Sequence, residues 1–169
     1  MFEMSGLATD TAFLQAASVG LINMVFTLLA MSLIEKIGRK KLMGIGSIGM
    51  IVSLITTAYL FQHGKGDVGI LIPLLVFIAS FAFSQGAVIW VFISEVFPNK
   101  VQASGQSFGT FVHWFWAAVM TWSFPIIAVM PGGGTIAFGF FAVAMILQFG
   151  FVLKYLPETK GRVLEEELA

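Results

Sequence analysis

Four long blocks of this sequence contain no Asp, Glu, Lys or Arg, and they constrain the fold more than any motif does. The blocks cover residues 11–34, 42–64, 68–94 and 101–153. A helix needs about 20 apolar residues to cross a bilayer, so the first three blocks hold one span each and the fourth holds two. Pro131-Gly132-Gly133-Gly134 marks the turn between those two. We therefore predict an all-α membrane protein with five transmembrane helices, at about 11–34, 42–61, 69–93, 102–129 and 135–153.

The composition excludes several other classes of protein. Only 11% of the residues are charged, whereas about 25% are charged in a soluble domain. So few charges cannot cover the surface of an ordinary globular enzyme. The formal net charge of zero argues against a nucleic-acid partner, and the absence of cysteine excludes a disulfide scaffold. The sequence shows no catalytic motif and no metal-ligand spacing, so we expect no enzyme activity, no metal and no cofactor.

The basic residues predict how the chain is oriented. Eight of the nine lie on one side of the predicted spans, and Lys65 alone lies on the other. The eight are Lys36, Arg39, Lys40, Lys41, Lys100, Lys154, Lys160 and Arg162. The positive-inside rule makes their side cytoplasmic. We therefore expect an integral protein of the cell membrane, with its N-terminus outside and residues 154–169 as a cytoplasmic tail. The first apolar block is too long for a signal peptide and lacks a basic flank.

Several predicted spans carry polar side chains that lipid disfavours. Asn23 lies near the middle of the first span, and Thr27 shares its face. From spacing alone, Asn23 either hydrogen-bonds to a neighbouring helix or lines a polar cavity. In the fourth span, His113 precedes Trp114. His113 either hydrogen-bonds to a neighbour or takes part in proton transfer, since a buried intramembrane His usually faces the bundle interior or water.

Glycine, tryptophan and proline add local expectations. Trp90 shares a face with Gly86, and it either anchors the helix at the headgroups or forms a flat wall on which a sugar ring can stack. Residues 44–49 match G-x-G-x-x-G, but no strand precedes them and no acidic residue follows at the required spacing, so we interpret these glycines as helix-packing positions. Gly105 and Gly109 also permit close helix contact. We expect the helices to be interrupted at the two prolines inside them, Pro73 and Pro125.

Three segments of mixed charge lie at helix ends on the basic side, at residues 35–41, 94–100 and 157–162. A charge run is usually only a solvated flank. Acids and bases together at three helix ends instead suggest ion pairs that cross-link the ends. Such pairs could hold one conformation shut and release it in another.

In and just before these segments the sequence reads, in order, E-x-x-G-R-K, G-x-x-x-W-x-x-x-S-E-x-F-P and P-E-T-K-G-R. The chain resembles the sugar porters of the major facilitator superfamily, to which bacterial xylose–proton symporters and human facilitative glucose transporters belong. The resemblance covers nearly the whole chain. It implies a transporter of twelve helices in two halves around a central sugar site, in which this chain looks like helices eight to twelve. Residues 1–10 then resemble the extracellular end of helix seven.

The resemblance also implies which residues act. It places the sugar site at Asn23, Phe81, Gly86, Trp90, His113 and Trp114. It places a cytoplasmic gate at Glu35, Gly38, Arg39, Lys40, Glu95, Glu158 and Arg162, closed by pairing within Glu35/Arg39, Glu95 and Glu158/Arg162.

Three departures from the family pattern change local expectations. Ala87 stands where the family often has proline, which predicts a milder unwinding of the helix there. His113 stands where the family usually has Gln or Asn, which changes the number of hydrogen-bond donors and the charge expected there. Gln102 stands in place of an arginine that would pair with acids such as Glu95, which predicts a weaker gate.

We therefore expect the C-terminal portion of a monosaccharide transporter that works by alternating access, with proton coupling left open. Its partners would be a monosaccharide, the lipid bilayer and the N-terminal helices of the same transporter, and no nucleic acid. Half a cavity cannot alternate access, so we expect no transport by residues 1–169 alone. The alternative is a structural or regulatory membrane subunit that carries porter motifs without transporting.

Overall fold

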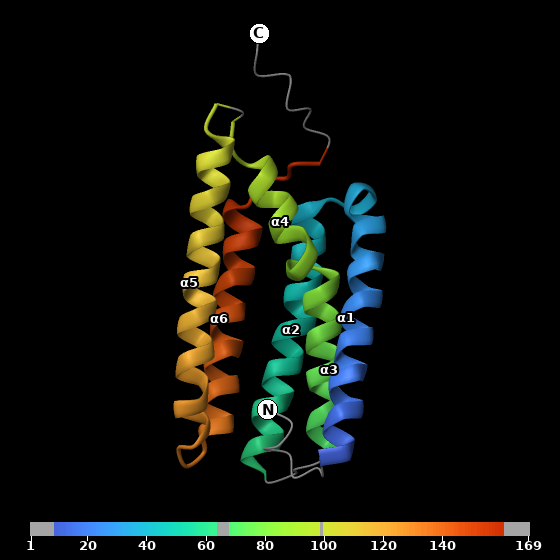
Figure 1. Ribbon diagram of the computed structural model, residues 1–169, viewed down its shortest axis with the longest axis vertical. Helices are drawn as coiled ribbons and strands as arrows, with labels where there is room; N and C mark the ends of the chain where they lie inside the picture. Colours follow the sequence, from blue (N-terminus) through green and yellow to red (C-terminus); the bar gives the residue numbers. More distant parts are fainter. Residues whose placement is uncertain (1–8, 64–67, 99, 161–169) are drawn as a thin grey trace.

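The computed structural model describes residues 9–63, 68–98 and 100–160. These residues form six helices and no strand. In chain order the helices are α1 (Thr9–Ile37), α2 (Arg39–Gln62), α3 (Val68–Phe83), α4 (Gln85–Glu95), α5 (Gln102–Ala128) and α6 (Gly133–Tyr155). They run up and down along the long axis of the bundle (Figure 1). Most of the segment predicted at 1–10, and residues 161–169 of the predicted tail, lie outside the described residues.

The prediction of five membrane-spanning helices is confirmed. Within the described residues, five stretches are long and apolar enough to cross a membrane: Ala16–Ile37, Arg39–Gln62, Gly69–Glu95, Gln102–Ala128 and Gly133–Tyr155. Several helices extend further than predicted at the end of the bundle where α1, α4 and α6 end and α2 begins, which we call the charged end. There α1 continues through Ile37, α2 already starts at Arg39, and α6 continues to Tyr155.

A single residue, Gly38, reverses the chain between α1 and α2. Its φ of 95° lies in the left-handed region that favours glycine. The Gly38 N–H donates to the Ile34 carbonyl at 3.0 Å, and its own carbonyl accepts from Leu42 at 3.1 Å, so both sides of the turn remain hydrogen-bonded. The turn predicted between α5 and α6 is also confirmed, with Gly132 left-handed at φ 71°.

The third predicted span is broken at Ser84 into α3 and α4. Ser84 has φ −122° and ψ −91°, and its N–H donates to the Phe81 carbonyl at 3.1 Å, one residue short of the helical pattern. The Ser80 carbonyl left over accepts the Ser84 hydroxyl at 2.7 Å. A backbone group freed inside hydrocarbon must find another partner, and Ser84 supplies it from its own side chain. The break therefore forms even though Ala87 replaces proline.

The expectation that prolines interrupt the helices is wrong. Pro73 lies inside α3 and Pro125 inside α5, and both helices continue past them. A proline removes one rung of the hydrogen-bond ladder, which a membrane helix tolerates.

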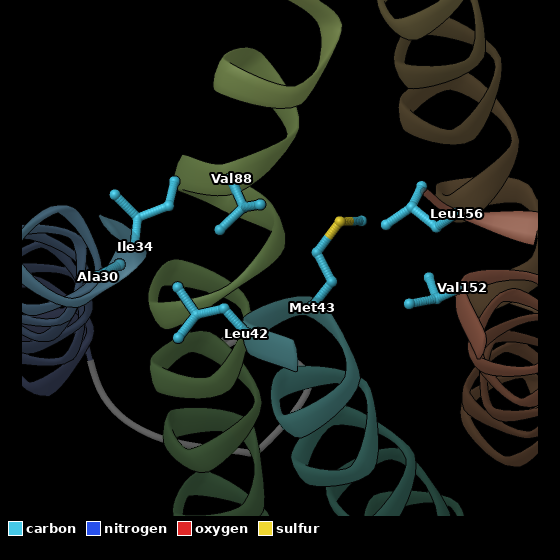
Figure 2. Packing of buried hydrophobic residues seen from close by; sticks show 7 residues of the cluster. All are labelled: Ala30, Ile34, Leu42, Met43, Val88, Val152 and Leu156. Carbon is cyan, nitrogen blue, oxygen red and sulfur yellow. The ribbon is translucent and has the colours of Figure 1, made fainter. Parts of the chain in front are cut away.

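Helix α2 is the centre of the bundle, since it packs against both α3 and α6. Two clusters of buried apolar residues lie along it. The cluster at the charged end joins α1, α2, α4 and α6 through Ala30, Ile34, Leu42, Met43, Val88, Val152 and Leu156 (Figure 2). The cluster at the other end joins α2, α3 and α6 through Leu54, Ile70, Leu74, Phe138 and Ala142. By contrast, no residue of α5 is fully buried.

Glycines let the helices approach closely, as predicted. A Cβ on Gly46 would overlap the Ser84 side chain and come within 2.8 Å of the Ser80 carbonyl, and one on Gly49 would overlap Ser80. The absence of a side chain at these two glycines of α2 therefore lets the end of α3 pack directly against the α2 backbone. In α5, a Cβ on Gly105 would overlap the ring of Phe97, so this glycine admits the segment that follows α4.

The close packing of α3 on α2 predicts that Gly46→Ala destabilises the fold. The added methyl has no space, and overpacking of this kind lowers the free energy of unfolding by about 1–3 kcal/mol. Gly139→Ala is the matched control, because a Cβ there meets nothing within 4 Å; it should be neutral or stabilise by up to about 1 kcal/mol. Thermal unfolding in detergent measures both. Equal melting temperatures for the two variants would contradict the packing described here.

Candidate functional site

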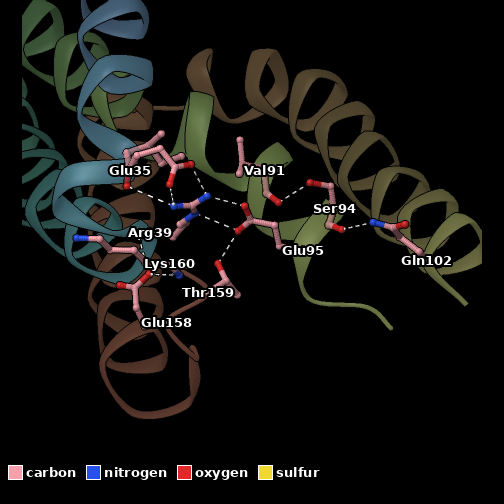
Figure 3. Close-up of polar contacts among 10 residues, drawn as sticks. Glu35, Arg39, Val91, Ser94, Glu95, Gln102, Glu158, Thr159 and Lys160 are labelled. Carbon is pink, nitrogen blue, oxygen red and sulfur yellow. Dashed lines mark hydrogen bonds and ion pairs between the residues drawn. The ribbon is translucent and has the colours of Figure 1, made fainter. Parts of the chain in front are cut away.

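The guanidinium of Arg39 lies at the centre of the charged end and joins α1, α2 and α4. Its Nε and Nη2 donate to the two carboxylate oxygens of Glu95 at 3.0 and 2.6 Å. Its Nη2 and Nη1 donate to the two oxygens of Glu35 at 2.7 and 3.1 Å. Nη1 also reaches the Ile34 carbonyl at 3.5 Å. All five N–H donors of the arginine are therefore used (Figure 3).

The two ion pairs of Arg39 differ in burial. The Arg39 side chain is 4% exposed and that of Glu95 is 21% exposed, whereas Glu35 is 69% exposed. Exposed ion pairs are screened by water and contribute little. The Arg39–Glu95 pair, which holds α4 against α2, is therefore the stronger structural contact. Glu35 binds the remaining side of the guanidinium from the exposed surface.

Glu158 accepts hydrogen bonds from two backbone N–H groups at the start of α2. Its Oε1 accepts the N–H of Arg39 at 2.9 Å, and its Oε2 accepts that of Lys40 at 3.2 Å. A carboxylate in this place satisfies free donors at the start of α2 and complements the helix dipole. A Cβ on Gly38 would lie 2.6 Å from Glu158 Oε2, so glycine is needed for the carboxylate to approach.

Two further residues after α6 complete the contact. The Thr159 hydroxyl, 1% exposed, donates to Glu95 Oε2 at 2.6 Å. Lys160 Nζ donates at 2.7 Å to the Lys36 carbonyl at the end of α1, where a cation is favourable. We refer to Glu35, Arg39, Glu95, Glu158, Thr159 and Lys160 as the Arg39 cluster. Together they fasten the segment after α6 to α1, α2 and α4.

Six of the seven predicted gate residues meet in or beside this cluster. They are Glu35, Gly38, Arg39, Lys40, Glu95 and Glu158. Lys40 takes part through its backbone N–H. Arg162 lies outside the described residues, so the predicted Glu158/Arg162 pair is untested, and Glu158 is already bonded to the start of α2. Gln102 donates to the Ser94 carbonyl at 2.6 Å and so caps the end of α4.

Thr159 and Lys160 are contacts of this cluster that the sequence did not predict. In their motif, P-E-T-K-G-R, the sequence predicts roles only for the acid and the arginine. A buried hydroxyl next to two acids carries no periodic signal, so its bond to Glu95 appears only in three dimensions.

The residues predicted for the sugar site fall into three groups. Trp90 of α4 and His113 of α5 meet edge-on, with ring centroids 4.9 Å apart, and His113 also lies edge-on to Trp114 at 5.6 Å. All three rings are exposed on the bundle, Trp90 by 40% and Trp114 by 62%. Edge-to-face pairs of this kind fix ring orientation.

Phe81 and Gly86 form a second group, on either side of the Ser84 break. A Cβ on Gly86 would lie 3.1 Å from the Phe81 ring, so the ring covers the glycine. Asn23 stands apart from both groups, exposed on α1, with its Oδ1 3.4 Å from the Thr27 hydroxyl that donates to it. The structure therefore joins α4 to α5 at Trp90, but it does not bring Asn23 to them.

Five apolar spans of this length and order define an integral membrane protein. The family model described as "Sugar (and other) transporter" matches residues 1–167, and the chain belongs to this family. Within the described residues, no three His, Asp or Glu side chains lie close enough to hold a metal ion.

Several similar relatives are named as sugar transporters. The chain is 33% identical over 173 residues to the D-xylose-proton symporter of Escherichia coli K12, covering 98% of the chain and 35% of the relative. It is 37% identical over 170 residues to the arabinose-proton symporter of Bacillus subtilis, covering 98% and 36%. The chain thus spans about a third of the length of the curated relatives it matches.

Solved structures of XylE have the same fold. A double-tryptophan mutant of XylE superposes with a TM-score of 0.91 at 32% identity, covering 98% of this chain and 36% of that one. The inward-open conformation of the xylose transporter XylE from E. coli superposes with a TM-score of 0.82 at 33% identity, covering 93% and 35%. The five helices therefore have the fold of part of a major facilitator transporter.

The paired hydrogen bonds from the Arg39 guanidinium to Glu95 predict that lysine cannot replace this arginine. Arg39→Lys keeps the charge but supplies a point donor in place of a planar fork, so Glu95 loses its paired contact. We expect the free energy of unfolding to fall by about 1.5–3 kcal/mol, the range for hydrogen bonds to charged groups. Lys40→Ala is the control, because Lys40 contributes a backbone N–H that alanine retains. Thermal unfolding in detergent compares them, and an Arg39→Lys variant as stable as Lys40→Ala would contradict this account.

Proposed function

We propose that residues 1–169 form the C-terminal portion of a monosaccharide transporter that works by alternating access, with the five spans in the places of helices eight to twelve. One observation carries the proposal. The Arg39 cluster fastens four segments at one end of the bundle, while the Trp90–His113–Trp114 group beyond it stays open to a ligand. A transporter needs both features, a closable end and an accessible site between the ends.

The charged end is proposed to face the cytoplasm of a cell membrane. The basic residues gathered there support this orientation through the positive-inside rule. The N-terminus would then face outward and the chain after α6 would lie in the cytoplasm.

The sugar is proposed to bind against the aromatic group of α4 and α5. The faces of Trp90 and Trp114 suit the C–H face of a pyranose, and polar groups of Asn23 and His113 suit its hydroxyls. Phe81 over Gly86 would complete the wall on the α3 side. The relatives named for xylose, arabinose and glucose support a monosaccharide as the substrate class.

The Arg39 cluster is proposed to be the cytoplasmic gate in its closed state. Its contacts join separate helix ends, so opening that end requires the Glu95 and Glu158 contacts to break together. Ion pairs that repack in this way give two discrete states rather than a continuous deformation.

Uptake of radiolabelled monosaccharides into proteoliposomes tests the proposal, using full-length protein that carries residues 1–169. We expect saturable uptake of at least one pentose or hexose, and dissipation of the proton gradient with an ionophore separates symport from facilitated diffusion. Uptake of no pentose or hexose would contradict the proposal and favour a non-transporting membrane subunit.

Trp90→Leu in that protein should weaken sugar binding about tenfold or more, because loss of a stacking face costs roughly 1–3 kcal/mol in comparable ring contacts. Trp122→Leu is the matched control, since Trp122 is 77% exposed on α5 and lies eight residues, or about 12 Å of helix, beyond Trp114. Equilibrium sugar binding measures both. Equal affinities in the two variants would remove Trp90 from the site.

A further inference from the structure

A second polar contact holds α4 against α2, and it lies inside the membrane-spanning part of the bundle. Ser47 of α2 is completely buried. Its hydroxyl lies 2.7 Å from the Met43 carbonyl and 3.0 Å from Gln148 Oε1 of α6, and it accepts the Nε2–H of Gln85 at 3.3 Å. One hydroxyl therefore connects α2, α4 and α6.

Gln85 is the first residue of α4, directly after the break at Ser84. Its neighbour Ser84 packs on Gly46, the neighbour of Ser47. Two consecutive residues at the break thus meet two consecutive residues of α2. The start of α4 is held on α2 by close packing of Ser84 on Gly46 and by the hydrogen bond from Gln85 to Ser47.

Two polar contacts of α4 are with α2. Glu95 at its end pairs with Arg39, and Gln85 at its start pairs with Ser47. The attachment points are about 15 Å apart along α4 and about 12 Å apart along α2, at 1.5 Å per residue, with the order reversed as for antiparallel helices. Gly86 and Trp90 lie between them. The orientation of this short helix is set at both ends.

From this geometry we infer that Ser47, with Gln85 and Gln148, is a positioning site for the sugar wall. It fixes the start of α4, and through it the direction of Trp90, whether or not the Arg39 cluster is closed. The inference rests on the proposed function of Trp90 and adds to it three residues that do not touch the sugar.

Their chemistry suits a fixed point inside a bilayer. With no water in the hydrocarbon to replace a lost partner, the Gln85 amide keeps its bond to Ser47. The Ser47 hydroxyl has a single proton for two acceptors, Met43 O and Gln148 Oε1. When the Ser47 hydroxyl donates its proton to Gln148 of α6, a lone pair of the Ser47 oxygen remains available to accept the N–H of Gln85.

The test uses full-length protein carrying residues 1–169, and it compares Ser47→Ala with Ser53→Ala. Ser53 is also buried on α2, but among the described residues its hydroxyl bonds only to the Gly49 carbonyl of its own helix. We expect Ser47→Ala to raise the sugar Kd about three- to tenfold, the range for one interhelical hydrogen bond in a membrane. Ser53→Ala should change it less than twofold. The maximal uptake rate should stay within about twofold in both, so the effect falls on KM.

A double-mutant cycle separates positioning from general loss of packing. Gln85→Met removes the donor on the α4 side and should raise Kd by a similar factor. The Ser47→Ala/Gln85→Met double variant should bind no more weakly than either single variant, because both remove the same bond. This comparison remains informative if one single variant is poorly stable.

The outcomes distinguish the two proposals. A Ser47→Ala variant with unchanged Kd, or fully additive effects in the cycle, would overturn the positioning role while leaving sugar transport in place. Wild-type protein that binds no monosaccharide would overturn the proposed function, and the positioning role with it.

Discussion

The guanidinium of Arg39 is the contact on which the charged end of the bundle depends. It uses all five donors, it lies at the first residue of α2, and the N–H of that same residue is bonded to Glu158. An arginine so enclosed needs both carboxylates, since an unpaired buried charge is costly. Gly38 makes the arrangement possible, because it reverses the chain in one residue and leaves room for the Glu158 carboxylate.

The break at Ser84 separates the direction of α4 from that of α3. Were α3 and α4 one continuous helix, the long helix would determine the direction of Trp90. The break gives α4 its own direction, and its contacts with α2 and α5 then determine where Trp90 lies. A rigid scaffold, α2, thus carries a short element whose two ends are fastened by different chemistry. The contact at Glu95 consists of charged groups near the surface, and the contact at Gln85 is a neutral hydrogen bond to the buried Ser47.

Charge spacing predicted the five spans because lipid admits long uncharged helices and little else. It also brought the charged segments to one end, where the ion pairs form. It did not predict the break, since the Ser80 carbonyl freed there is satisfied by Ser84, whose sequence signal is weaker than that of a proline. The pairing of Glu158 with Arg162 stays a prediction, because Arg162 lies outside the described residues. The sequence did not predict that Glu158 accepts hydrogen bonds from the free N–H groups at the start of α2. The Ser47–Gln148 contact joins residues 101 positions apart, and no local pattern encodes a pairing at that distance.

The exposed polar groups complete the argument for a ligand site. Asn23 accepts a hydrogen bond from Thr27, and among the described residues its two amide N–H donors have no acceptor. The ring contacts of His113 are with two tryptophans rather than with a polar partner. Both side chains are exposed on helices whose surroundings are otherwise apolar. Facing hydrocarbon, such groups would be strongly unfavourable. In the proposed site, a cavity that holds water or a sugar would supply the acceptors and donors they lack, and the aromatic faces beside His113 would offer the same ligand an apolar surface.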